Sequence, residues 1–203
     1  MVTSASSDRR GQAHTLEAIA AGILLLSSVA FALQVTAVTP LTGSTSNQRI
    51  EDHQAVVAED VLASQAANET LSAGLLYWND TRRQWHGAPW DGYHDGAPEA
   101  TALGRALNDA LLDRGVAYNL NVYFWRNDQR IREQVVYLGE PSDHASVATW
   151  TVTLYDDDEL RDADGDPTGT TLADAGDGYF APDVEPGGPV RTVVVVEVVT
   201  WRM

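Results

Sequence analysis

One acid-rich stretch, DDDELRDADGDPTGTT at residues 156–171, holds the side chains best suited to binding a cation. Asp162, Asp164 and Asp166 alternate as do the first oxygen ligands of a calcium loop. The glycine expected sixth in such a loop is Pro167, however, and the glutamate expected twelfth is Ala173. The sequence therefore predicts either a weak calcium site at these aspartates or a loop of solvated carboxylates, and we expect no other cofactor.

Two of the five histidines, His86 and His94, lie close together in HGAPWDGYHDG, with Asp91 and Asp95 beside them. A metal site here requires the loop to bring these side chains to within about 2 Å of one ion. We expect instead a surface loop anchored by its aromatic residues, Trp85, Trp90 and Tyr93. The chain has no nucleophile elbow, phosphate-binding loop or dinucleotide fingerprint, so we expect a protein that is not an enzyme.

The charge balance is strongly acidic. The chain has 29 acidic residues against 13 basic ones, all arginine, and a net charge of -16. Such a charge repels itself in dilute buffer, whereas at molar salt the Debye length falls to about 3 Å and the repulsion is screened. The composition resembles that of proteins from extremely halophilic archaea; the alternative is an acidic surface for a specific cationic partner. Nucleic acid is not an expected partner, because phosphate binding needs clustered arginine or lysine.

An uncharged apolar run extends from Ala18 to Val38. At about 1.5 Å per residue it spans about 30 Å, the thickness of the hydrocarbon core of a membrane. Arg9 and Arg10 precede the run, and the acid-rich bulk of the chain follows it. The positive-inside tendency therefore predicts a single-pass protein of the cell membrane, with its N-terminus in the cytoplasm and its C-terminal domain extracellular.

The residues before this run resemble the class III signal peptide of archaeal type IV pilins and pilin-like proteins. The matching positions are Arg9, Arg10, Gly11 and Gln12, followed by Glu17. The resemblance implies that a prepilin peptidase cuts ahead of the apolar helix, which stays in the mature protein as anchor and assembly core. Cleavage after Gly11, which we expect, makes Glu17 the sixth mature residue. Cleavage after Gln12 restores the fifth position of the family pattern but leaves a glutamine before the scissile bond.

Glu17 is an unusual residue for a membrane-spanning helix, because a carboxylate near the interface costs up to a few kcal/mol. In pilins such an acid is thought to pair with the N-terminal amine of an adjacent subunit. The resemblance therefore implies that Glu17 acts in assembly. The alternative is that Glu17 reaches toward water, where its charge also suits the positive end of the helix.

Pro40 and Gly43 interrupt the helix after the apolar run, and two further helices are predicted beyond them. The first covers 46–67, with Thr45 and Gln48 as a capping box. The second covers 98–114 and ends at Gly115, and its leucines repeat every four residues, at Leu103, Leu107 and Leu111.

The remaining elements are predicted strands. A short hairpin pairs 75–78 with 84–86, and alternating segments at 116–125, 131–138 and 146–155 predict an antiparallel meander. The final run, VRTVVVVEVVTW, is apolar on both faces apart from Arg191 and Glu197, which predicts a strand inside the sheet with cover on each side. The predicted fold class is α+β: a long N-terminal transmembrane and amphipathic helix followed by an antiparallel sheet with one further helix, as in a pilin.

These elements predict four segments: a cytoplasmic basic leader (1–11), a transmembrane helix (12–39), a juxtamembrane amphipathic helix (40–68) and an extracellular α+β domain (69–203). Asn68 and Asn79 begin acceptor sequons for glycosylation, which matter only if that domain is outside the cell. We expect a pilin-like structural protein of a surface filament, with the membrane, prepilin peptidase, and itself or other pilin-like subunits as partners. The alternatives are an anchored extracellular binding module that does not assemble, with or without a weak calcium site, and an anchored hydrolase or calcium-dependent protein that uses the 156–166 loop.

Overall fold

The computed structural model describes residues 17–32 and 41–203, and gives the backbone alone at 41–52. The chain divides into two compact units, Met1–Gln48 and Arg49–Met203. Residues 17–32 form a helix. Within the described ranges, no helix is both long enough and apolar enough to cross a membrane. Residues 33–38, the end of the predicted span, lie outside the described ones.

Helix α2 (Leu41–Ala67) begins earlier than predicted, so Thr45 lies inside the helix and not at its cap. In the second unit α2 buries Gln54, Ala58 and Leu62, which recur every four residues and so share one face of the helix. The short helix α3 (Thr70–Leu75) follows. Leu75, predicted to begin a hairpin, is the last residue of α3. The hairpin is therefore shorter than predicted and consists of β1 (Trp78–Asn79) paired with β2 (Gln84–Trp85).

Helix α4 (Ala102–Ala110) and the 3-10 turn η1 (Leu112–Arg114) replace the single helix predicted over 98–114. The start is later because the Thr101 side chain accepts a hydrogen bond from the Gly104 backbone N–H and so caps α4. Its leucines are buried, as their spacing predicted. Gly115 ends η1 with a φ of 73°, which confirms the predicted stop.

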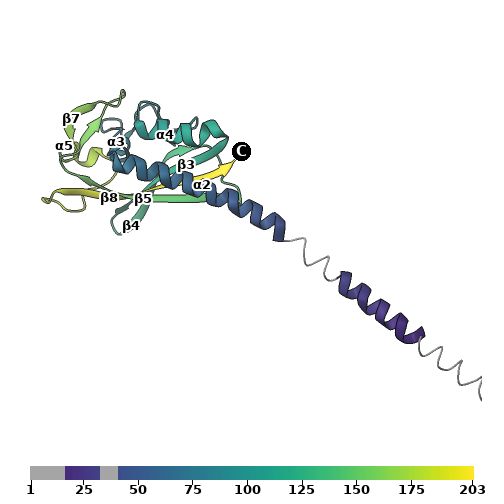
Figure 1. Cartoon of the computed structure of the whole chain (residues 1–203). Helices are drawn as coiled ribbons and strands as arrows, with labels where there is room; N and C mark the ends of the chain where they lie inside the picture. The colour runs from purple at the N-terminus through teal and green to yellow at the C-terminus, as the bar shows by residue number, and fades with distance from the viewer. Residues whose placement is uncertain (1–16, 33–40) are drawn as a thin grey trace, which may run out of the picture. The chain divides into compact units, whose positions relative to one another are not determined.

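The centre of the second unit is a four-stranded antiparallel sheet in the order β4–β3–β8–β5 (Figure 1). Its strands are β3 (Val116–Arg126), β4 (Gln129–Tyr137), β5 (Ser146–Tyr155) and β8 (Val190–Arg202). All four were predicted, and β3 pairs with β4 as a meander requires. The rest of the predicted meander is wrong, because β5 does not pair with β4 and β8 lies between β3 and β5. The valine-rich final strand therefore has a partner along each of its edges, as its apolar character favours.

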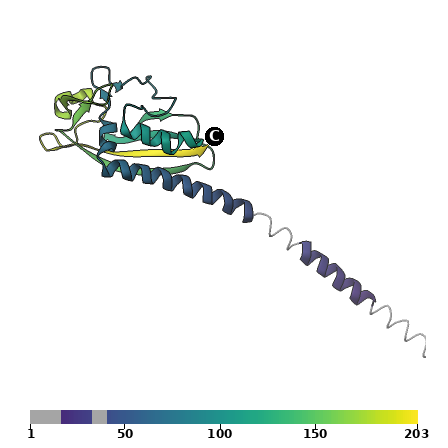
Figure 2. The same ribbon diagram turned by 45° about the horizontal axis from the view of Figure 1, so that its top comes forward.

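Helices cover one face of this sheet. In Figures 1 and 2, α2 and α4 run alongside the strands. On this face Val194, Val196 and Val198 of β8 are fully buried, in one core with Leu62 of α2 and Leu107 of α4. The fold class is α+β, with the core between the helices and this face of the sheet.

The prediction that β8 is covered on each side is wrong for its opposite face. Val193 is 43% exposed and Val147, on β5, is 52% exposed. Val195 and Val199 are partly buried but do not pack against the core, and the register places Val199 opposite Val147. We call the surface formed by these four valines, Val147, Val193, Val195 and Val199, the open face.

A second layer of short elements lies between β5 and β8 in the sequence. It contains the hairpin β6 (Glu159–Arg161) and β7 (Pro167–Thr171), helix α5 (Leu172–Ala175) and the turn η2 (Gly176–Gly178). An aromatic cluster holds this layer to the β1–β2 hairpin. Within it, Phe180 packs edge-on against Trp78 and Phe124, with ring centroids 5.4 Å apart in both pairs.

Candidate functional site

The predicted processing residues, Arg9, Arg10, Gly11 and Gln12, lie outside the described residues, whereas Glu17 is the first described residue of the helical segment 17–32. The Glu17 side chain is exposed. The large apolar side chains of this helix are between 56% and 74% exposed: Ile19, Ile23, Leu24, Leu25, Leu26, Val29 and Phe31. An apolar surface of this extent is characteristic of a segment that contacts lipid or protein.

Asp162 holds the turn of the β6–β7 hairpin. Its Oδ1 accepts hydrogen bonds from the backbone N–H groups of Asp164, at 2.9 Å, and Asp166, at 3.0 Å. The side chains of Asp164 and Asp166 are exposed. Over the part of the chain that the structure describes, no group of three or more histidine or acidic side chains is placed to hold a metal ion. The predicted calcium ligands are thus neighbours in one turn, and one oxygen of Asp162 stabilises that turn.

The two sequon asparagines differ in their surroundings. Asn68 is exposed after the end of α2, and its Nδ2 donates to the Ser64 carbonyl at 2.8 Å. Asn79 lies in β1, and its Oδ1 accepts from the Arg82 backbone N–H at 2.8 Å. Of the two, Asn68 is the more accessible to a modifying enzyme, and its glycosylation stays a prediction.

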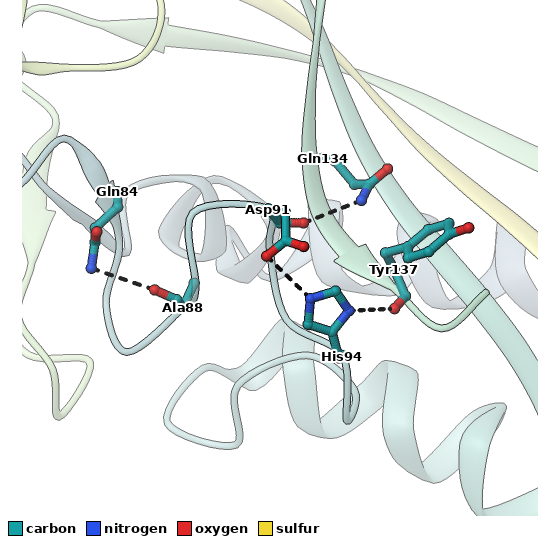
Figure 3. A network of polar contacts seen from close by, with 6 residues as sticks. All are labelled: Gln84, Ala88, Asp91, His94, Gln134 and Tyr137. Carbon is teal, nitrogen blue, oxygen red and sulfur yellow. Dashed lines mark hydrogen bonds and ion pairs between the residues drawn. The ribbon is translucent and has the colours of Figure 1, made fainter.

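His86 and His94 have separate partners. His86 Nε2 lies 2.9 Å from the Arg161 carbonyl, and its ring packs against Tyr77. His94 Nδ1 lies 3.2 Å from the Tyr137 carbonyl, and Nε2 lies 3.2 Å from Asp91 Oδ1 (Figure 3). Both neighbours of His94 are hydrogen-bond acceptors, so the protonated ring, which has an N–H on each nitrogen, satisfies both of them. The hydrogen bond to Asp91 accordingly raises the pKa of His94.

The His94 contacts belong to a network that covers one edge of the sheet. Gln134 Nε2 donates to the Asp91 carbonyl at 3.2 Å (Figure 3), and the backbone of Tyr93 bridges β4 through Val135 and Tyr137. Covering an edge strand in this way blocks pairing with other chains. Trp85 is buried and Tyr93 packs against the core, as expected, but Trp90 is 91% exposed and is not an anchor. The network therefore stabilises the loop that holds Asp91 and His94 against the edge strand.

A polar cavity of about 300 Å³ lies between the β1–β2 and β6–β7 hairpins, with His86, Asp162 and Thr168 in its lining. It is the place where an anchored hydrolase would have its site. The Nε2 of His86 lies 2.9 Å from the Arg161 carbonyl, and the Thr168 hydroxyl donates to the Leu160 carbonyl at 3.0 Å. Each of these two groups thus has a backbone carbonyl as its partner.

A polar cluster that the sequence analysis missed lies among the strands, on the same side of the sheet as the open face. Glu197 of β8 accepts hydrogen bonds on Oε1 from the Tyr123 hydroxyl, at 2.9 Å, and from Asn121 Nδ2, at 3.1 Å. The Arg130 guanidinium lies 4.1 Å from the centre of the Tyr123 ring, a cation–π contact. Glu197 was visible as the one acid in the valine run, but its partners depend on the pairing of β3 with β8.

Comparison with protein families gives one match, in which the model of a family of unknown function, DUF7288, covers residues 10–200. The matched span takes in the apolar run and the strands of the described part, apart from the last two residues of β8. Neither the curated proteins nor the solved structures include a match. On the strength of the family match over most of its length, the chain belongs to the DUF7288 family of unknown function.

Proposed function

We propose that this protein is a membrane-anchored, extracellular, pilin-like structural protein of a halophilic archaeon, a subunit or accessory of a type IV pilus-like surface filament. The observation that best supports the proposal is the order of elements along the chain. A basic leader and an apolar run precede α2, which in turn packs its Gln54, Ala58 and Leu62 face into the core beneath an antiparallel sheet. This order suits an anchor that carries a rigid folded domain.

The helix at 17–32 has the side chains that an anchor needs. Its exposed leucines, isoleucines and phenylalanine suit a lipid environment or contact with other apolar helices. The Ser28 hydroxyl donates to the Leu25 carbonyl at 2.8 Å, so this polar group is satisfied within the helix, as an apolar environment requires. Small residues at Ala20, Ala21 and Gly22 allow a neighbouring helix to approach closely.

Processing and assembly follow from the same segment. In this proposal, prepilin peptidase recognises Arg9 to Gln12 and cuts after Gly11, and the new α-amino group belongs to Gln12, five residues before Glu17 in the sequence. The Glu17 carboxylate pairs with the amine of an adjacent subunit and so sets the register between helices. Pairing of this kind offsets the cost of a carboxylate at the membrane interface.

Mass spectrometry of the mature protein from membranes tests the processing step. We expect the chain to begin at Gln12. A mature chain that begins at Met1 or Val2, or one recovered free of lipid without its apolar run, would remove the basis of the proposal.

A pair of matched substitutions tests assembly. Glu17→Gln removes the charge in the apolar helix, and Glu59→Gln removes an exposed charge on α2 as a control. We expect Glu17→Gln to abolish incorporation into sheared surface filaments while the folded domain and the membrane anchoring persist, and Glu59→Gln to behave as the wild type. The rival function, an anchored binding module that does not assemble, predicts that neither change has an effect and that the wild type itself is absent from filaments.

A further inference from the structure

The open face is an apolar surface in an unusual position. Two neighbouring residues of β8 differ in exposure. Val194 is 0% exposed on the face that the helices cover, whereas Val193 is 43% exposed on the other face. Across the sheet, Trp125 of β3 is 58% exposed on the same side as Val193. Exposed apolar side chains that gather on one face of a folded domain commonly mark a contact with another molecule.

The charge on this side of the sheet differs from that of the whole chain. The net charge of the protein is -16, yet on this side the four strands carry a single acid, Glu197, which is hydrogen-bonded to Tyr123 and Asn121. Arg130 and Arg132 project from β4 on the same side, opposite Trp125 and Tyr123. Neither arginine forms an ion pair within the described part of the chain. Tyrosine, tryptophan and arginine are the residues that dominate binding energy in protein interfaces.

The acid-rich segment 156–166 has the opposite character. It carries seven acids against one arginine, and Asp157, Glu159, Asp164 and Asp166 are all exposed. The hydrogen bonds of Asp162 and the β6–β7 ladder fix the backbone of this segment. Its acids are therefore presented on a preformed turn.

We propose that the open face, with its flanking Arg130 and Arg132, binds segment 156–166 of a second copy of this chain. The inference rests on the proposed role in assembly and names a contact between the folded domains. Arg130 and Arg132 pair with the exposed acids of the neighbouring turn. Tyr123 and Trp125, which lie opposite the two arginines on β3, together with the valines on the strands beyond, exclude water around those pairs. At molar salt only charges in direct contact attract one another appreciably, so this apolar surround is essential.

The two surfaces belong to different parts of one subunit, so the contact is heterologous and a chain of copies can grow in one direction. The whole side of the sheet that includes the open face has four strands about 4.8 Å apart and is roughly eight residues long, which gives an area of about 500 Å². Stable complexes bury roughly 800 Å² on each partner. One such contact is therefore weak. It supplements the packing of the N-terminal helices and does not replace it.

The absence of cysteine from the sequence makes crosslinking a clean test. Two differently tagged full-length copies are co-expressed, one with Val193→Cys and the other with Asp164→Cys, and membranes at molar salt are treated with a short bismaleimide. We expect the mixed dimer to exceed by about tenfold the product obtained when the second copy carries Asp113→Cys, an exposed acid on η1, in place of Asp164→Cys. Arg132→Glu in the first copy should reduce the mixed dimer about tenfold, and Asp166→Arg in the second should restore it.

Each other result overturns the inference. Equal yields with Asp164→Cys and Asp113→Cys would mean that the contact is non-specific, and monomers alone would mean that it does not form. Val193→Cys homodimers without mixed dimers would place two open faces against each other. Mass spectrometry of the mature N-terminus in the same membranes tests the proposed function separately, because a chain that begins at Met1 or Val2 would contradict that function whatever the crosslinking result.

Discussion

The Tyr123 hydroxyl donates a hydrogen bond of 2.9 Å to the Glu197 carboxylate, and the two residues lie on the adjacent central strands β3 and β8. Asn121, also on β3, supplies a second donor to the same oxygen at 3.1 Å. A carboxylate in the middle of a valine strand is tolerated because these two groups replace the water it would lose. Burial, together with the hydrogen bond to Glu197, raises the pKa of Tyr123.

Tyr123→Phe removes one of these donors and tests this account. We expect the free energy of unfolding to fall by about 1 kcal/mol, below the usual range for a hydrogen bond to a charged group, because solvent reaches this side of the sheet. Chemical denaturation at molar salt measures the change. Tyr155→Phe, on an exposed tyrosine of β5, should change nothing, and an equal loss there would point to a general effect of removing hydroxyls.

A larger loss is expected at Tyr118, which is buried beneath the helices. Its hydroxyl donates to Asn108 Oδ1 and accepts from the Ala97 backbone N–H, each at 2.7 Å. Tyr118→Phe removes both bonds and leaves the Ala97 N–H and Asn108 Oδ1 only the longer bond between them, at 3.3 Å. We expect the free energy of unfolding to fall by about 1–3 kcal/mol. The same denaturation measurement should therefore rank Tyr118→Phe as more destabilising than Tyr123→Phe. The reverse order would contradict the buried network.

Gly104 gives a test in which two physical effects have opposite signs. It lies in α4, where helix propensity alone predicts that Gly104→Ala stabilises the protein by about 1 kcal/mol. A Cβ at this position, however, would lie 2.1 Å from the Pro98 carbonyl oxygen, closer than any real contact. We expect destabilisation by several kcal/mol, because the turn at Pro98–Thr101 must move. A rise in the melting temperature would show that this turn is displaced without cost.

The sequence predicted best the elements whose pattern is local. The alternation of β3 placed Tyr118, Leu120, Val122 and Phe124 in the core, and all are at most 3% exposed. In the same alternation Asn119 belongs to the opposite face, where a polar side chain is expected to meet water, yet Asn119 is 6% exposed. It is buried because it bonds the Leu138 N–H and the Gly139 carbonyl, a partnership set by the path from β4 to β5 and not by β3 itself.

The hydrophobic pattern of the sequence could not predict which distant strands pair with one another. The run of valines in β8, apolar on both faces, indicated that the strand lies inside the sheet, but such a pattern does not say which strands are its neighbours. The insertion of β8 between β3 and β5, and with it the pairing of Glu197 with Tyr123, therefore came only from the structure. Because β8 is apolar on both faces, we expected other elements to cover both faces of the sheet. In the described part of the chain, helices cover only one of them. The processing residues Arg9 to Gln12 stay a prediction, since they lie outside the described ranges.

His94 predicts a dependence of stability on pH. The hydrogen bond to Asp91 raises its pKa in the folded state, so the charged ring is favoured by folding. This contribution is fully present below the unfolded pKa and is lost as the pH rises through the raised folded value. The melting temperature of the wild type should fall relative to that of His94→Gln as the pH rises from about 6 to about 8. Parallel curves for the two proteins would mean that the loop at 91–94 does not depend on the charged ring.

The two faces of β8 allow folding and assembly to be separated with a single chemical change. Val194→Asp places a carboxylate in the fully buried core with no partner, which costs several kcal/mol, so the variant should unfold at temperatures where the wild type is stable. Val193→Asp puts the same group on the open face, where water reaches it, and should cost about 1 kcal/mol or less. Circular dichroism at molar salt compares the two.

If the open face is a contact surface, Val193→Asp should also lose the crosslink between copies although it folds, because the new charge meets the acids of segment 156–166. A variant at Val193 that unfolds as readily as the one at Val194 would mean that this side of the sheet is as dry as the core, and the open face would then be no surface at all.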